Sequence, residues 1–175
     1  MAFDLAGLLE QYLGSGGGQV ADNAADHFHQ VAQNVSPDVL SHGLAAAFKS
    51  DQTPPFGEMV AQLFAQGNPQ QQAGMLTQLL GSLGPAALAA LTNSGVLAGL
   101  QAQGGSPGSG AITAEQVSQV TLEQVQAIAS HAEQHSPGII DKMSGFYAEH
   151  PGLVKTLGGA ALSIALAKIA ERRKS

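Results

Sequence analysis

Histidine is the residue type in this chain with the clearest capacity for chemistry. The six histidines are His27, His29, His42, His131, His135 and His150. His131 and His135 are four residues apart, so on a helix they lie on one side, a spacing that can hold two metal ligands. A zinc-protease motif needs glutamate directly after the first histidine, where this chain has Ala132. No third ligand is apparent, so we interpret both as surface histidines and expect neither a metal nor another cofactor.

Other residues that support catalysis are few or are placed where structure explains them. The chain contains no cysteine, which excludes a disulfide, a cysteine–zinc site and a thiol nucleophile. Most carboxylates lie near expected helix starts, where they stabilise the positive end of the helix dipole. No nucleophile-elbow motif occurs between a strand and a helix, and no Ser-His-Asp order stands out. We therefore predict that the protein is not an enzyme.

The composition indicates a globular protein with an unusually uncharged surface. Hydrophobic residues make up 44% of the 175 residues, but charged residues make up only 11%, against about 25% in a typical domain. Such a surface has little electrostatic repulsion to prevent self-association. The net charge is −6, and the only basic cluster is Lys168, Arg172, Arg173 and Lys174. This distribution argues against binding to a nucleic-acid backbone, which needs clustered cations.

Apolar residues recur at helical spacing along the chain, and strand signals are nearly absent. Proline marks the expected helix starts at Ser36-Pro37, Thr53-Pro54, Asn68-Pro69, Gly84-Pro85, Ser136-Pro137 and His150-Pro151. Proline suits the first helical position, and a preceding serine hydroxyl can cap free amides. Thr113-Gln116 and Thr121-Gln124 have the spacing of capping boxes. We predict an all-α fold: an open bundle of about seven to nine short helices with corners at the prolines.

Two glycine-rich stretches divide the predicted helices. Residues 101–110, QAQGGSPGSG, carry too few apolar side chains to offset the entropy of ordering. We predict a flexible linker there, between helical parts at 1–100 and 111–175, with the second part packing on the first. Residues 14–18, GSGGG, predict a shorter hinge. The Ser-Pro corners at 36–37 and 136–137 arise either from an internal duplication or from repeated use of one helix-start signal, and both explanations stay open.

Five large apolar residues in the middle of the chain have two interpretations. They are Phe56, Met59, Leu63, Phe64 and Met75. At helical spacing in consecutive helices, such residues usually form a core. Methionine-rich surfaces also form adaptable grooves for a partner helix or an apolar ligand. These five residues are therefore our candidate contacts for a partner or a small apolar ligand.

The first half of the chain contains the segments LLEQYLGSGGG, VSPDVLSHGLAAAF and GMLTQLLGSLGP. Together with the Gly-Ala-rich C-terminal end, they resemble the bacterial YidB-like family, small helical proteins of unknown function. The resemblance covers mainly residues 5–100. It implies an open helical bundle in a bacterial protein and supplies no catalytic residues.

These observations lead to one leading function and two alternatives. We expect a non-enzymatic interaction or scaffold protein of the bacterial cytoplasm that binds a protein partner or itself. The first alternative is a module that binds an apolar ligand or lipid through the five candidate residues. The second is attachment to a membrane surface through residues 151–174, which combine an apolar helix with a basic end. The apolar stretch TLGGAALSIALA has 12 residues, fewer than the roughly 18 to 20 that span a bilayer.

Overall fold

A computed structural model describes residues 4–14, 23–102 and 112–174, and within these ranges it contains twelve α-helices and no strand. The predicted all-α fold is confirmed. The helices are α1 Leu5–Gly14, α2 Ala24–Asn34, α3 Pro37–Phe48, α4 Phe56–Gln66, α5 Pro69–Gly81, α6 Pro85–Asn93, α7 Ala98–Ala102, α8 Ala114–Val117, α9 Leu122–His135, α10 Ile139–Glu149, α11 Pro151–Val154 and α12 Gly159–Lys174.

The helices form two compact units whose boundaries differ from the predicted parts 1–100 and 111–175. Unit 1 comprises Met1–Pro54 and Ser144–Ser175, and unit 2 comprises Pro55–Met143. The difference arises because α12 finds its apolar neighbours on α1, α2 and α3, while α9 packs on α4 and α5. Of the predicted linker 101–110, the first two residues end α7, and 103–110 lie outside the described residues. Most of the predicted hinge at 14–18 also lies outside them.

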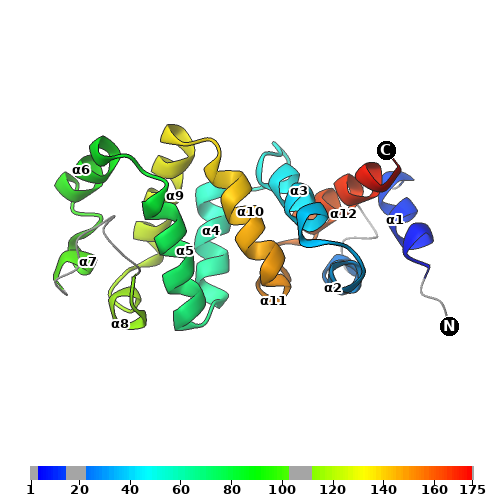
Figure 1. The fold of residues 1–175 in the computed structure, drawn as a ribbon, viewed down its shortest axis with the longest axis horizontal. Coiled ribbons are helices and arrows are strands. Elements are labelled where there is room, and N and C mark those ends of the chain that lie inside the picture. Colours follow the sequence, from blue (N-terminus) through cyan, green and yellow to red (C-terminus); the bar gives the residue numbers. More distant parts are fainter. Residues whose placement is uncertain (1–3, 15–22, 103–111, 175) are drawn as a thin grey trace. The chain divides into compact units, whose positions relative to one another are not determined.

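In unit 1, helix α12 lies beside α3, α1 and α2 (Figure 1). Successive turns of α12 bury Leu162, Ala165, Leu166, Ile169 and Ala170. On α3, Gly43 permits a close crossing: a Cβ atom there would lie 2.7 Å from the carbonyl oxygen of Ala165 and 2.7 Å from Ile169 Cγ1. The backbones of α3 and α12 are therefore held together at a position that admits no side chain.

The prediction of a single helix over residues 151–174 was wrong, because this segment forms two helices. Helix α11 ends at Val154, and α12 begins only at Gly159. The Thr156 hydroxyl donates to the carbonyl of Leu153 at 2.7 Å, which satisfies a carbonyl at the end of α11. Gly158 and Gly159 follow, and glycine lowers the helix propensity of this junction by roughly 1 kcal/mol per residue relative to alanine.

In unit 2, α4 packs against α9, and α5 packs against α8, α9 and α4 (Figure 1). Gly57 on α4 has the role that Gly43 has in unit 1, since a Cβ atom there would meet the hydroxyl of Ser130 and the carbonyl oxygen of Gln126 on α9. The backbone amide of Ile112 also donates to Thr77 Oγ1 at 3.1 Å. The chain on either side of 103–111 is thus joined within one unit.

Four of the six predicted proline starts are helix starts, whereas α10 begins at Ile139, two residues after the predicted Pro137, and the capping differs from one start to another. Helices α3, α5, α6 and α11 begin at proline, whereas α4 begins at Phe56, two residues after the predicted Pro54. Asn68, Thr113 and Thr121 each form a complete capping box. Ser36, however, makes no side-chain capping bond, and Ser136 donates instead to the carbonyl oxygen of Ser82 at 2.8 Å. The prediction that these two serines cap their helices was wrong.

Candidate binding groove

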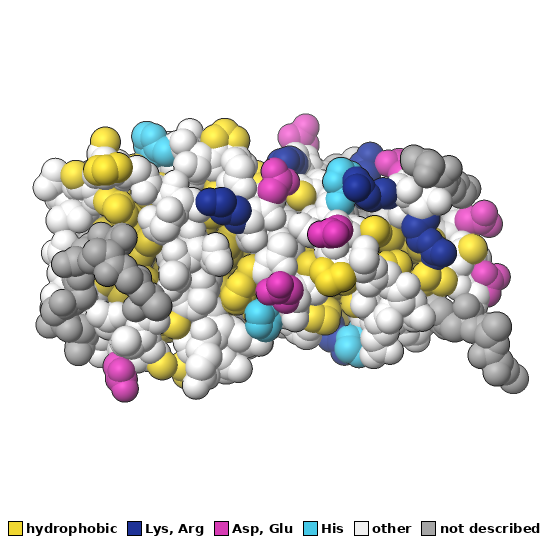
Figure 2. Space-filling model, viewed as in Figure 1, with side chains coloured by type: hydrophobic (Ala, Val, Ile, Leu, Met, Phe, Trp, Pro, Cys, Tyr) yellow, Lys and Arg dark blue, Asp and Glu magenta, His cyan; other side chains and the backbone are white. Residues whose placement is uncertain are grey.

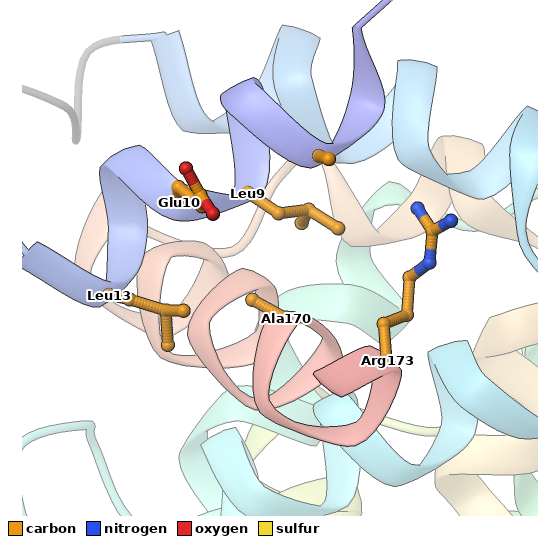
Figure 3. A pocket seen from close by; sticks show the side chains of 6 residues that line it. Leu9, Glu10, Leu13, Ala170 and Arg173 are labelled. Carbon is orange, nitrogen blue, oxygen red and sulfur yellow. The ribbon is translucent and has the colours of Figure 1, made fainter. Parts of the chain in front are cut away.

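A groove opens in unit 1 between α1 and α12, and we call it the α1–α12 groove. It has a volume of about 140 Å³ and is lined by Ala6, Leu9, Glu10, Leu13, Ala170 and Arg173. Figure 3 shows Leu13 towards one end, Arg173 at the other, and Leu9 and Ala170 between them. The floor is aliphatic, and one acidic and one basic side chain lie at its border.

The groove exists because α1 has a broader apolar stripe than its neighbours cover. Leu8, Leu9 and Tyr12 are buried, with 9% or less of each residue exposed. Leu13 lies one turn after Leu9, at the spacing that places both residues on one side of a helix, yet 37% of it is exposed. Among the described residues, Leu13 is the large hydrophobic residue that is exposed in unit 1, and Leu122 is the one that is exposed in unit 2.

Helix α1 is also fixed to α2 by a polar contact. The hydroxyl oxygen of Tyr12 lies 2.6 Å from Nδ1 of His27, and the two rings meet edge to face with centroids 5.8 Å apart. Burial raises the pKa of Tyr12 from 10.0 to about 12. The hydroxyl therefore keeps its proton at neutral pH and can donate to the imidazole. This bond stabilises the helix that supplies one wall of the groove.

On the α3 side of α12 lies a second depression, the α3–α12 cleft, lined by His42, Lys168, Glu171 and Arg172. Its volume is about 470 Å³, but its lining is polar and charged. Lys168 Nζ and Glu171 Oε2 form an ion pair at 2.8 Å, with 46% and 54% of the two side chains exposed. An exposed pair of this kind contributes about 0 to 1 kcal/mol, so it fixes little. Figure 2 shows acidic and basic side chains interspersed on this face of unit 1.

The sizes of these two sites limit what they can bind. Pockets for small molecules usually enclose about 300 to 1,000 Å³ and are mainly apolar. The α1–α12 groove is apolar, but its volume of 140 Å³ is well below that range. The α3–α12 cleft is large enough, but its lining is charged. The groove therefore suits a single aliphatic side chain presented by a protein surface better than it suits a free ligand.

The five apolar candidates from the sequence lie in the interior of unit 2 rather than on a surface. Phe56, Met59, Leu63, Phe64 and Met75 are each exposed by 3% or less. Helices α4 and α5 bury these five side chains among other apolar residues, which matches the interpretation that they form a core. In this conformation no partner can touch their side chains, so the proposed contact at these residues would require unit 2 to open.

The histidines are dispersed between the two units. His131 and His135 lie on α9 with their rings stacked, the centroids 6.0 Å apart and the planes 2° from parallel. Nδ1 of His131 is buried without a hydrogen-bond partner. In unit 1, the backbone carbonyl of Phe146 lies 2.9 Å from Nδ1 of His150. Within the described residues, no three His, Cys, Asp or Glu side chains gather closely enough to hold a metal ion.

The predicted membrane-binding segment 151–174 has its apolar residues turned inward. Leu157 and Leu166 are exposed by 4% and 0%, and Ile164 is half-buried. In the described part of the chain, no single helix combines the length and hydropathy needed to cross a bilayer. Helices α5 and α6 reach those limits only when taken together, and they are bent by 116°.

Comparisons with protein-family models, with curated proteins and with solved structures give no match to this chain.

None of the groove residues was among the five candidate contacts from the sequence, although Ala170 and Arg173 lie within the predicted membrane-binding segment 151–174. The sequence places Leu13 on the apolar stripe of α1, which by itself indicates burial. The usable signal was the width of that stripe: Leu5, Leu8, Leu9, Tyr12 and Leu13 occupy more of the helix than one neighbour covers. The approach of Arg173 to the same stripe is a tertiary contact, which spacing along the chain does not encode.

Proposed function

We propose that this protein is a non-enzymatic interaction protein that binds a protein segment through the α1–α12 groove. The observation that carries the proposal is the joint position of the groove and Leu13. An exposed leucine beside an aliphatic depression gains from being covered. The YidB-like resemblance of residues 5–100 favours a bacterial setting, and we place the protein in the cytoplasm as part of the same proposal.

The energetics favour a protein partner over a lone ligand. Complete burial of a leucine side chain contributes about 1.5 to 3 kcal/mol. Since 37% of Leu13 is exposed, covering it adds roughly 1 kcal/mol, or about fivefold in affinity. That gain is too small to hold a free small molecule by itself. It matters as the central contact of a larger surface, where a few well-packed side chains dominate the binding energy.

Burial within the two units argues against the two alternative functions. An apolar-ligand module would have to expose Phe56 or Met75, which are exposed by 1% and 0%. Membrane attachment would have to release Leu157 and Leu166 from unit 1, where they are exposed by 4% and 0%. Each alternative therefore needs a partial unfolding step, whereas the groove is accessible in the folded state.

Site-specific photo-crosslinking tests the proposal. A photoreactive amino acid replaces Leu13 in the full chain, and a matched control replaces Leu122, which is 47% exposed on α9. We expect a defined protein adduct from position 13 and none of comparable yield from position 122. The adduct should disappear when the groove is filled by Ala6→Trp, a substitution at an exposed position. Equal labelling from both positions, or no adduct from position 13, would contradict the proposal.

A further inference from the structure

The α3–α12 cleft combines the size of a small-molecule pocket with an excess of positive charge. Its volume of about 470 Å³ lies within the range of about 300 to 1,000 Å³ that such pockets enclose. Its lining contains two cations, Lys168 and Arg172, together with the carboxylate of Glu171 and the imidazole of His42. We propose that this cleft binds a small molecule through a phosphomonoester group. The site is separate from the α1–α12 groove, so the inference goes beyond the proposed function and does not depend on it.

The close crossing of α3 and α12 holds the two walls of the cleft in place. His42 directly precedes Gly43, and Lys168 directly precedes Ile169. A Cβ atom on Gly43 would lie 2.7 Å from Ile169 Cγ1, so His42 and Lys168 are next to the two residues that meet at the crossing. Helices packed this tightly present the cleft already formed, which lowers the free-energy cost of binding a ligand.

The two cations on α12 would both gain from a shared anion. Lys168 and Arg172 are four residues apart, so their side chains lie on one side of the helix and repel each other. Arg172 is in the last turn of α12, which ends at Lys174, and a cation there stabilises the negative end of the helix dipole. That effect falls off within the last turn, so it does not account for Lys168. An anion between the two side chains removes their repulsion.

Contacts within the chain leave hydrogen-bond donors of the cleft available. Lys168 Nζ carries three donors, and its ion pair with Glu171 Oε2 at 2.8 Å uses one of them. In the described part of the chain, the side chains of Arg172 and His42 form no hydrogen bond or ion pair. The guanidinium of Arg172 presents a planar fork that matches two oxygens of a phosphate. Lysine and histidine can then donate to the remaining acceptor positions.

A phosphomonoester suits this lining better than a carboxylate or a polyanion. It carries about −1.5 to −2 charges at pH 7 and three strong acceptor oxygens, one for each of the donors His42, Lys168 and Arg172. A carboxylate has two oxygens and one charge. Two cations and one carboxylate give the lining a net charge of +1 when the imidazole is neutral, which is too little for a nucleic-acid backbone. The ligand class is therefore a small molecule with one terminal phosphate.

Nuclear magnetic resonance of the ¹⁵N-labelled full chain tests the site, with glycerol 3-phosphate as the probe at constant ionic strength. The chain has two arginines, Arg172 and Arg173, and Arg173 lines the α1–α12 groove instead. Their side-chain Nε–H signals therefore report on the two depressions separately. We expect the Arg172 signal to shift with a dissociation constant of about 1 mM or lower, and the Arg173 signal to shift much less. If the Arg172 signal shows no saturable shift up to about 10 mM probe, the inference is overturned.

Neutral substitutions locate the site, with binding measured on the backbone amide signals. Lys168→Gln and Arg172→Gln should each weaken binding about tenfold or more, because each removes a charge-assisted hydrogen bond. Lys155→Gln is the matched control, since Lys155 is an exposed lysine of unit 1 that does not line the cleft, and it should change the affinity by less than about twofold. Glu171→Gln removes the repelling carboxylate and should tighten binding about threefold. Circular dichroism establishes that each variant is folded. Equal losses in Lys168→Gln and Lys155→Gln would reveal attraction to the overall charge and would overturn the inference.

Phosphatidic acid carries the same phosphate group on a lipid, and flotation with vesicles distinguishes the two sources. The full chain and Arg172→Gln are each mixed with phosphatidylcholine vesicles that contain or lack phosphatidic acid. We expect neither protein to float with either vesicle, which assigns the site to a soluble phosphomonoester. Flotation of the full chain that needs both phosphatidic acid and Arg172 would assign the site to the lipid headgroup.

Discussion

Gly43→Ala should destabilise unit 1 although it improves the helix propensity of α3. Gly43 lies in the interior of α3 and is buried against α12. A Cβ atom at this position would lie 2.7 Å from the carbonyl oxygen of Ala165, about 0.7 Å short of the 3.4 Å at which ordinary contact begins. A second clash, also at 2.7 Å, involves Ile169 Cγ1. The side chain of Ile169 can rotate away, but the carbonyl belongs to the backbone of α12, so the two helices must separate.

The magnitude follows from two opposing terms. Overpacking a well-filled core typically costs about 1 to 3 kcal/mol, and more when backbone must move. Alanine in place of glycine within a helix returns about 1 kcal/mol. Because the clash involves backbone, we place the overpacking term at or above the upper end of its range and expect a net loss of roughly 2 kcal/mol. With a urea dependence of about 1 to 3 kcal/mol per molar, this loss shifts the unfolding midpoint by about 1 M.

Tyrosine fluorescence can follow this change in unit 1 alone. The chain has two tyrosines and no tryptophan. Tyr12 and Tyr147 both belong to unit 1, which comprises residues 1–54 and 144–175. Urea unfolding detected by tyrosine fluorescence therefore reports on unit 1, while far-ultraviolet circular dichroism reports on the helices of both units.

Gly81→Ala is the matched control. Gly81 is the last residue of α5 in unit 2, and a Cβ atom there meets nothing within 4 Å. The same chemical change should stabilise unit 2 slightly or leave it unchanged, by about 0 to 1 kcal/mol. If Gly43→Ala leaves the tyrosine-detected midpoint unmoved, or if both variants lose stability equally, then the close crossing of α3 and α12 does not have the role assigned to it.

Three further predictions concern other contacts. Gly57→Ala should cost about 1 to 3 kcal/mol in unit 2, because its Cβ would lie 2.8 Å from a backbone carbonyl oxygen of α9; the loss should appear by circular dichroism, and an equal shift in tyrosine fluorescence would contradict it. Burial raises the pKa of Tyr12 from 10.0 to about 12, so the contribution of protonated Tyr12 to stability is complete below pH 10 and is lost as the pH rises towards 12. In a Tyr147→Phe chain, the tyrosinate absorbance of Tyr12 should titrate near pH 12, and titration near pH 10 would refute this. Thr121→Ala removes a capping box and should lower the free energy of unfolding by about 1 kcal/mol. Ser36→Ala removes no capping bond and should change the free energy of unfolding by less than about 0.5 kcal/mol. Equal losses for the two variants would show that α9 and α3 are capped alike.

Local signals in the sequence predicted the local structure well. Thr113 and Thr121 form the capping boxes that their spacing to glutamine predicts. Here both partners lie within one helical turn, so the sequence contains the whole interaction. Ser136 shows the limit of such reasoning, because its hydroxyl donates to the carbonyl of Ser82. A residue 54 positions away competes with the local cap, and no spacing within the helix reveals it.

The division into units depends on contacts of the same long-range kind. The low apolar content of residues 101–110 predicts a linker, but it does not say which helices before and after that segment pair with each other. Pairing depends on which apolar faces fit, and Gly57 provides a close contact between α4 and α9. Gly57 is the second residue of α4, so its place in the sequence gave no such signal. Gly43, in the interior of α3, did give one, because the cost of glycine in helix propensity implies a packing reason.

Small residues lie on both sides of α12, but only those on the α3 side are in close contact with a neighbouring helix. This contrast favours the groove on the α1 side as a binding site. On the α3 side, the missing side chain of Gly43 is explained by the carbonyl of Ala165 at 2.7 Å. On the α1 side, Ala6 and Ala170 line a space of about 140 Å³. Protein interiors are usually close-packed, as at Gly43, whereas Ala6 and Ala170 border a space that no side chain of this chain fills. An aliphatic side chain from another protein surface would fill that space.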